Sequence, residues 1–244
     1  MASQSSSDDN TPSPTKDENT IPTIQPKRNT DPNVLAPFNP TNALTQSTAL
    51  ELFALDATDT APSNSSHVLF DLGCGDARVL IQAVQDFPHV RCVGLELDPV
   101  FVQRACDRIA TLPAHVQDRI DIRQADLTDA SLWESRQDSN NSSGNDDDGR
   151  SPLPINQLTL MDDATCIYIY LLPQGIVQLL PFLRRLVQHR GQKPLKVIAC
   201  TFRIREWEPS IVVNTGKSGV IKTYLYEFGR SGSSDEHSLK NNYS

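Results

Sequence analysis

The chain has 244 residues, five cysteines and a net charge of −8 at neutral pH. Once the polar stretches at both ends and in the middle are set aside, roughly 175 residues of ordered-looking sequence remain, enough for one well-buried domain. The acidic balance argues against a general electrostatic grip on nucleic-acid phosphates, and the scattered cysteines show no zinc-ligand spacing, so we expect no metal site.

Residues 1–32 are rich in Ser, Thr, Pro, Asp and Asn, and we expect them to form a disordered tail. They resemble neither a signal peptide nor a transit peptide, and no run of about 18 apolar residues predicts a membrane span. We therefore expect a cytoplasmic location. The expected domain covers 33–229, with a disordered acidic insert at about 135–152 and a second disordered tail at 230–244.

The N-terminal half of the domain alternates apolar, β-rich runs with stretches of helical periodicity. Thr41 or Asn42 can cap a first helix, and the pair Asp98-Pro99 is a typical start for a later one. In chain order, the pattern predicts a helix near 43–53, a strand at 68–71, a helix at 76–87, a strand at 91–97, a helix from 98 onward and a strand at 119–123.

The C-terminal half follows the polar insert. It opens with the apolar run 164–172, which suits a central strand buried on both faces. The pattern then predicts a helix at 174–188, a strand at 196–201, and a hairpin formed by 210–214 and 220–228. Repeated strand–helix alternation closed by a hairpin predicts an α/β fold with a mostly parallel sheet.

The turn after the first strand, Asp71-Leu72-Gly73-Cys74-Gly75, is the most informative segment. Gly73 and Gly75 allow a tight turn and a close approach of the backbone to a ligand. The Asp71 carboxylate can accept hydrogen bonds from an α-amino group, whereas it would repel the pyrophosphate of a dinucleotide. Arg78 also stands where the dinucleotide pattern needs a third glycine. These features predict S-adenosylmethionine as the cofactor.

Two further acids stand at the ends of the next two predicted strands. Glu96 lies about twenty residues beyond the turn, where a carboxylate can accept hydrogen bonds from both ribose hydroxyls. Asp126 follows the third strand and can meet the adenine amino group, although acids are also common wherever a strand gives way to a turn. We expect Asp71, Glu96 and Asp126 to hold the cofactor together.

The segment after the fourth strand, 168–174, faces the reacting methyl group in folds of this class. It lacks the Asn/Asp-Pro-Pro-aromatic motif of enzymes that methylate adenine or glutamine nitrogens. Its Tyr, Leu and Pro residues instead suit an aliphatic stem and a cation. We expect Tyr168 to fill the core, whereas Tyr170 fits the core and the acceptor site equally well.

The stretch Phe202-Arg203-Ile204-Arg205-Glu206-Trp207-Glu208-Pro209 resembles the F-x-I/F-x-x-W-x-P segment of a seven-strand methyltransferase family. That family includes the mitochondrial protein-lysine methyltransferases acting on ATP synthase subunit c and on the adenine nucleotide translocase. The residues 71–78 are similar to its D-(I/L)-G-S-G-D-G-R motif, with Ala77 in place of a glycine. The resemblance implies a Rossmann-like, seven-stranded class I fold, protein-lysine N-methylation and a protein partner that carries the target lysine.

Tyr170, Pro173 and Trp207 are candidates for the acceptor channel, although Trp207 fits a hydrophobic plug under the terminal hairpin equally well. Phe38 is a candidate for contact with the cofactor or the acceptor. The polar N-terminus is unlike the apolar one of the animal mitochondrial members, which leaves a mitochondrial location open. Methylation of a small molecule or of RNA, and S-adenosylmethionine binding without catalysis, remain alternatives. The oligomeric state is open.

Overall fold

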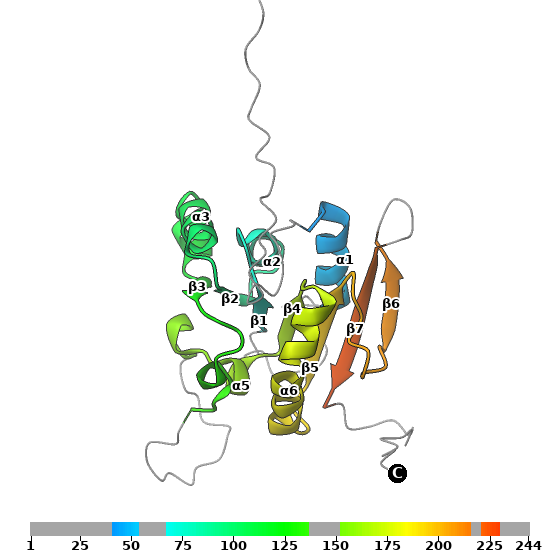
Figure 1. The fold of residues 1–244 in the computed structure, drawn as a ribbon. Coiled ribbons are helices and arrows are strands. Elements are labelled where there is room, and N and C mark those ends of the chain that lie inside the picture. Colours follow the sequence, from blue (N-terminus) through cyan, green and yellow to red (C-terminus); the bar gives the residue numbers. More distant parts are fainter. Residues whose placement is uncertain (1–40, 54–66, 137–151, 216–220, 230–244) are drawn as a thin grey trace, which may run out of the picture.

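The computed structural model describes residues 41–53, 67–136, 152–215 and 221–229. These ranges contain a seven-stranded sheet in the order β3-β2-β1-β4-β5-β7-β6 (Figure 1). The first five strands in the chain run parallel, while β7 runs antiparallel between β5 and β6. The strands are β1 (Val68–Leu72), β2 (Arg91–Glu96), β3 (Ile120–Gln124), β4 (Cys166–Ile169), β5 (Leu195–Cys200), β6 (Ile211–Asn214) and β7 (Lys222–Phe228).

Helices cover both faces of this sheet (Figure 1). One face packs against α1 (Ala43–Phe53), α2 (Arg78–Asp86) and α3 (Pro99–Ala110). The other face packs mainly against the 18-residue helix α6 (Pro173–Arg190). The short elements are α4 (Ala114–Gln117), α5 (Leu160–Asp163) and the 3₁₀ helices η1 (Ala130–Trp133) and η2 (Ile155–Gln157). None of the helices in the described ranges has the length and apolarity needed to cross a membrane.

All five residues of β1 are buried, as expected for a central strand with helices on both sides. Side chains alternate across a strand, so Leu69 packs toward α2 while Phe70 and Leu72 pack toward α6. By the same alternation, Asp71 projects toward the face that carries α1, α2 and α3. This places the only charged residue of the strand in the layer between the sheet and α2.

The predicted elements occur in the predicted order, and both capping predictions are confirmed. Asn42 Oδ1 accepts a hydrogen bond from the Thr45 N–H at 2.9 Å, and Asp98 Oδ1 accepts one from the Val100 N–H at 2.8 Å. The strand predicted at 164–172 is shorter, because β4 covers only Cys166–Ile169. Residues 170–172 leave the sheet, and Pro173 then starts α6.

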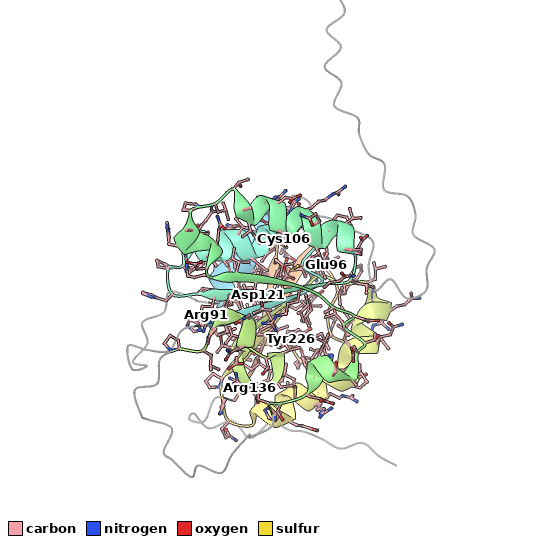
Figure 2. The ribbon with its side chains drawn as sticks, turned by 90° about the vertical axis from the view of Figure 1, so that its left-hand side faces the viewer. Arg91, Glu96, Cys106, Asp121, Arg136 and Tyr226 are labelled. Atoms are coloured by element: carbon pink, nitrogen blue, oxygen red, sulfur yellow. The ribbon has the colours of Figure 1, made fainter. Side chains whose placement is uncertain are left out.

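The ends of the polar insert are fixed at the amino edge of the parallel strands. The Arg136 N–H donates to Asp162 Oδ2 at 2.7 Å, and the Arg136 guanidinium pairs with Asp163 at 2.9 Å. On the other side of the insert, the Arg91 guanidinium donates to the Leu153 carbonyl. Asp162 and Asp163 precede β4 and Arg91 begins β2, whereas Glu96 lies at the opposite end of β2 (Figure 2). The predicted disordered segments lie largely outside the described residues.

This placement predicts that the insert is dispensable for cofactor binding. We expect replacement of 137–151 by a short Gly/Ser linker to leave the affinity for S-adenosylmethionine unchanged, because both anchors lie at the edge opposite Glu96. Isothermal titration calorimetry on the full chain and the variant checks this. A weaker affinity in a variant that melts like the parent would contradict it.

Candidate active site

The turn between β1 and α2 is built from residues with left-handed backbone conformations. Gly73 has a φ of +91° and Gly75 a φ of +55°. The N–H groups of Gly73 and Cys74 both donate to the Leu95 carbonyl, at 2.8 and 3.1 Å, so the turn is fixed against the end of β2. Ala77 also has a positive φ, +60°, at the position where the family motif has a glycine. The turn keeps its left-handed course there, at a cost of roughly 1–2 kcal/mol for a residue with a Cβ.

Two glycines lie in close packing around this turn. A Cβ on Gly73 would lie 3.2 Å from Leu171 Cδ2, so the missing side chain lets the segment after β4 pack over the turn. A Cβ on Gly94 would lie within 2.8 Å of three side chains at once, those of Cys74, Leu80 and Ile122. Gly94 pairs with Asp71 in the sheet and was not singled out from the sequence. A glycine inside an apolar strand was the available signal.

The Asp71 side chain is only 3% exposed. Burial, together with repulsion from Glu96 and Asp76, raises the pKa of its carboxyl well above the usual range. Within the described part of the chain, no group donates a hydrogen bond to this carboxylate. A ligand cation with N–H donors would therefore stabilise the ionised form of Asp71.

Glu96 connects the turn to the start of α3. Its Oε2 accepts a hydrogen bond from the Gly75 N–H at 2.8 Å, and its Oε1 accepts one from the Asp98 N–H at 3.0 Å. Both bonds hold the carboxylate at the carboxyl end of β2, below α3 (Figure 2). Because each carboxylate oxygen can accept more than one hydrogen bond, Glu96 retains the capacity to bind a pair of hydroxyls.

Asp126 lies two residues beyond β3, next to Glu96 in the neighbouring strand. The Ala125 N–H donates to the Glu96 carbonyl at 2.8 Å, which extends the pairing of β2 and β3 to this point. Asp126 Oδ1 accepts hydrogen bonds from the N–H and the hydroxyl of Thr128, at 2.8 and 2.7 Å. One carboxylate oxygen therefore stabilises a local turn, as the structural alternative for this residue predicts. The side chain remains exposed at the edge of the sheet.

Asp76, the third carboxylate near Asp71, is neutralised by two arginines. It pairs with Arg78 at 2.6 Å and with Arg108 at 3.0 Å. Partial burial opposes ionisation, but the hydrogen bond and the charge of Arg78, aided by Arg108, outweigh it and lower the pKa of the Asp76 carboxyl. Asp76 therefore connects α2 to α3 and is not available to a ligand in the way Asp71 is.

On the acceptor side, the structure separates the aromatic residues. Tyr168 is buried in the core, and its hydroxyl lies 3.1 Å from Thr41 Oγ1 and 3.2 Å from Cys200 Sγ, which favours the expected core role. Tyr170 is half-buried and packs against the same core layer, so both of its interpretations stay open. Pro173 is exposed as the first residue of α6. Phe38 lies outside the described residues.

The contacts of Trp207 favour the hydrophobic plug over the acceptor channel. Its ring packs edge-on against Tyr226 and Phe228, with centroid distances of 5.7 and 4.8 Å. Phe228 pairs with Leu195, the first residue of β5, and therefore lies at the amino edge of the parallel strands. The structure thus places Trp207 toward the edge opposite the Asp71 turn, as the hydrophobic-plug alternative predicts.

Asp71 near the end of β1, Glu96 as the last residue of β2 and Asp126 just after β3 therefore lie at one edge of the sheet, on three adjacent strands. Across the described ranges, no group of three His, Cys, Asp or Glu side chains is placed to hold a metal ion. Such an edge can hold an extended ligand that carries an ammonium group near Asp71 and a diol near Glu96. S-adenosylmethionine has both groups in this order.

No family model matches this chain. It is 24% identical over 171 residues to a protein-lysine N-methyltransferase of Saccharolobus islandicus (strain REY15A), covering 69% of this chain and 84% of that protein. It is 35% identical over 74 residues to the tRNA1(Val) (adenine(37)-N6)-methyltransferase of Porphyromonas gingivalis (strain W83), but spans only 28% of that protein's length.

Among solved structures, an RNA methyltransferase from Salinibacter ruber in complex with S-adenosyl-L-homocysteine is similar to this chain. The TM-score is 0.54 at 25% identity, and the match covers 82% of this chain and 100% of the other. Together with the sheet order and its antiparallel C-terminal strands, this similarity confirms the expected class I methyltransferase fold.

The substitution Asp71→Asn separates the role of this residue in cofactor binding from the loss of stability that its buried charge causes. Because the folded-state pKa is raised, ionisation of Asp71 destabilises the folded protein as the pH rises through that pKa. Without ligand, we expect Asp71→Asn to melt at a higher temperature than wild type on the alkaline side, and at the same temperature at low pH. With ligand, the variant should bind S-adenosylmethionine far more weakly.

The affinity of wild type for S-adenosylmethionine should fall as the pH drops through the raised pKa of Asp71. Melting and titration series across pH check both; normal binding by the variant would contradict the assignment.

Glu96→Gln tests the second carboxylate with little change in shape. Loss of the charged acceptor for the ribose hydroxyls should weaken cofactor binding about 10- to 100-fold, in line with hydrogen bonds to charged groups. Glutamine is preferable to alanine, because its amide oxygen can still accept one of the two bonds that fix the Gly75 turn and Asp98, whereas alanine removes both. Calorimetry measures the affinity, with Asp118→Asn, an exposed acid just before β3, as the matched control. Equal affinities for both variants would refute the role.

Proposed function

We propose that this S-adenosylmethionine-dependent methyltransferase transfers its methyl group to the side-chain amine of a lysine in a protein. The observation that carries the proposal is the negative charge at the edge formed by the carboxyl ends of the parallel strands, here called the carboxyl edge. In addition to the buried Asp71, this edge carries the carboxylates of Glu96, Asp98 and Asp126. Such an edge attracts a cationic acceptor and repels the phosphates of a nucleic acid. The similarity to a protein-lysine N-methyltransferase of Saccharolobus islandicus supports the same acceptor.

The segment between β4 and α6 supports an aliphatic acceptor. Leu171 is buried against Gly73, while Leu172 remains 37% exposed directly before the exposed Pro173. An apolar rim packs against the methylene stem of a lysine and makes its charged ammonium form less favourable. A lysine amine with a pKa of about 10.4 is almost fully protonated near pH 7, so this environment assists the loss of the proton that must precede methyl transfer.

In this proposal each cofactor-binding residue contacts a different group of S-adenosylmethionine. Asp71 accepts hydrogen bonds from the α-ammonium group, and Glu96 accepts them from the ribose hydroxyls. Asp126 lies at the adenine end, where Leu97, 40% exposed directly after Glu96, offers an apolar surface to the base. The bound cofactor supplies an electrophilic methyl group on a sulfonium. The chain's residues align it with the acceptor, since an in-line displacement depends above all on positioning.

The proposal is tested by transfer of labelled methyl from S-adenosylmethionine into a cell extract, followed by separate digestion with protease and ribonuclease. We expect a protease-sensitive labelled band with wild type and with the control Asp118→Asn, and none with Asp71→Asn. Mass spectrometry of the band should find methyl-lysine. Label that only ribonuclease removes would favour RNA, the acceptor named for the Porphyromonas gingivalis and Salinibacter ruber proteins. Label found only in small molecules would also contradict a protein acceptor.

A further inference from the structure

Thr201, the first residue after β5, has an unusual backbone conformation. Its φ is +69°, and the Phe202 N–H donates to the Cys200 carbonyl at 2.8 Å, which closes a three-residue turn around it. A γ-turn with a positive central φ is rare and strained. For a β-branched residue a positive φ is a clear outlier.

The surrounding structure holds Thr201 in this conformation from several sides. The Thr201 N–H donates to the Lys222 carbonyl at 2.7 Å, which continues the pairing of β5 with β7. Cys200 is fixed by the contact of its Sγ with the buried Tyr168 hydroxyl at 3.2 Å. On the other side, Phe202 packs against the core layer that contains α6. Strain of this kind persists only where neighbouring contacts enforce it, and it occurs preferentially at functional sites.

The need for a turn does not explain why the residue is a threonine. Glycine adopts this φ without steric cost, and it does so in this chain at Gly73 and Gly75. A threonine at position 201 therefore presents a side chain at a point where the backbone alone would favour none. Within the described ranges, no hydrogen bond engages the Thr201 hydroxyl, and the residue is half-buried.

The sheet order places Thr201 on the acceptor side of the cofactor. The three cofactor carboxylates lie at the carboxyl ends of β3, β2 and β1, and the next strands in the sheet are β4 and β5. Ile169 pairs with Ala199, so Thr201 lies level with Leu171, in the segment that leaves β4 toward α6. Because β4 lies between β1 and β5, Thr201 is two strands from Asp71, and neighbouring strands are about 4.8 Å apart.

We propose that the Thr201 hydroxyl binds the acceptor amine and orients the lone pair of the amine nitrogen toward the methyl group. This inference rests on the methyl transfer proposed above, but not on lysine being the acceptor. The hydroxyl accepts a hydrogen bond from the acceptor N–H and keeps its own proton throughout. The amine lone pair forms the new N–C bond, the C–S bond breaks with its electron pair going to sulfur, and the surplus proton of the product amine passes to solvent. S-adenosyl-L-homocysteine is the second product.

Three substitutions test this role, with the unmethylated form of the protein identified by labelling as the acceptor probe. Thr201→Val keeps the shape and removes the hydroxyl, and we expect kcat/KM for the acceptor to fall about tenfold. Thr201→Ser keeps the hydroxyl and should stay close to wild type. Thr201→Gly should melt no lower than wild type, because it relieves the strained φ, and should lose transfer as the Val variant does.

Cofactor affinity, measured by calorimetry, should be the same in all three variants and in wild type, because Thr201 lies outside the carboxylate set on β1, β2 and β3. Equal kcat/KM for Thr201→Val and wild type would overturn the inference while leaving the proposed function intact. If wild type labels RNA or a small molecule instead, lysine specificity fails and the same variants are compared on that acceptor. Absence of transfer to every acceptor would overturn both proposals.

Discussion

The buried carboxylate of Asp71 lies beside two further carboxylates, those of Glu96 and Asp76, and is repelled by both. The surrounding residues reduce this electrostatic repulsion without removing it. Arg78 and Arg108 neutralise Asp76, and the Gly75 N–H donates to Glu96. Asp71 itself receives no such compensation within the described ranges. A buried charge without a partner is costly, so the apo fold carries an electrostatic penalty that a bound ammonium group would relieve. The strength of cofactor binding and the stability of the free protein are therefore opposed at this one residue.

The sheet order divides the carboxyl edge into two functional halves. Carboxylates lie at the carboxyl ends of β1, β2 and β3, whereas apolar and hydroxyl side chains follow β4 and β5. Beneath the second half, buried hydroxyls connect α1 to the sheet through the contacts Thr41–Tyr168, Thr45–Thr215 and Thr215–Thr223. Satisfied buried polar networks make a structure rigid. The N-terminal helix is thereby fixed next to the strand end from which Thr201 emerges.

The shared position of Asp71, Glu96 and Asp126 could be predicted from the sequence, because each lies at the carboxyl end of a parallel strand and those ends meet at one edge of the sheet. The position of Trp207 could not be predicted in this way, because it depends on the path of the chain from β5 back to β6, which local sequence does not specify. The φ of Thr201 was equally hidden, because neighbouring strands impose it on a residue type that avoids it.

A crystal structure of the protein with S-adenosyl-L-homocysteine would test the central claim most directly, because the ligand carries the ammonium group, the diol and the adenine of the cofactor. We expect the ammonium nitrogen to lie within hydrogen-bond distance of the Asp71 carboxylate, and both ribose hydroxyls to bind Glu96. The sulfur would then face β4 and β5. A ligand bound elsewhere, or bound at this edge with neither carboxylate in contact, would contradict the account.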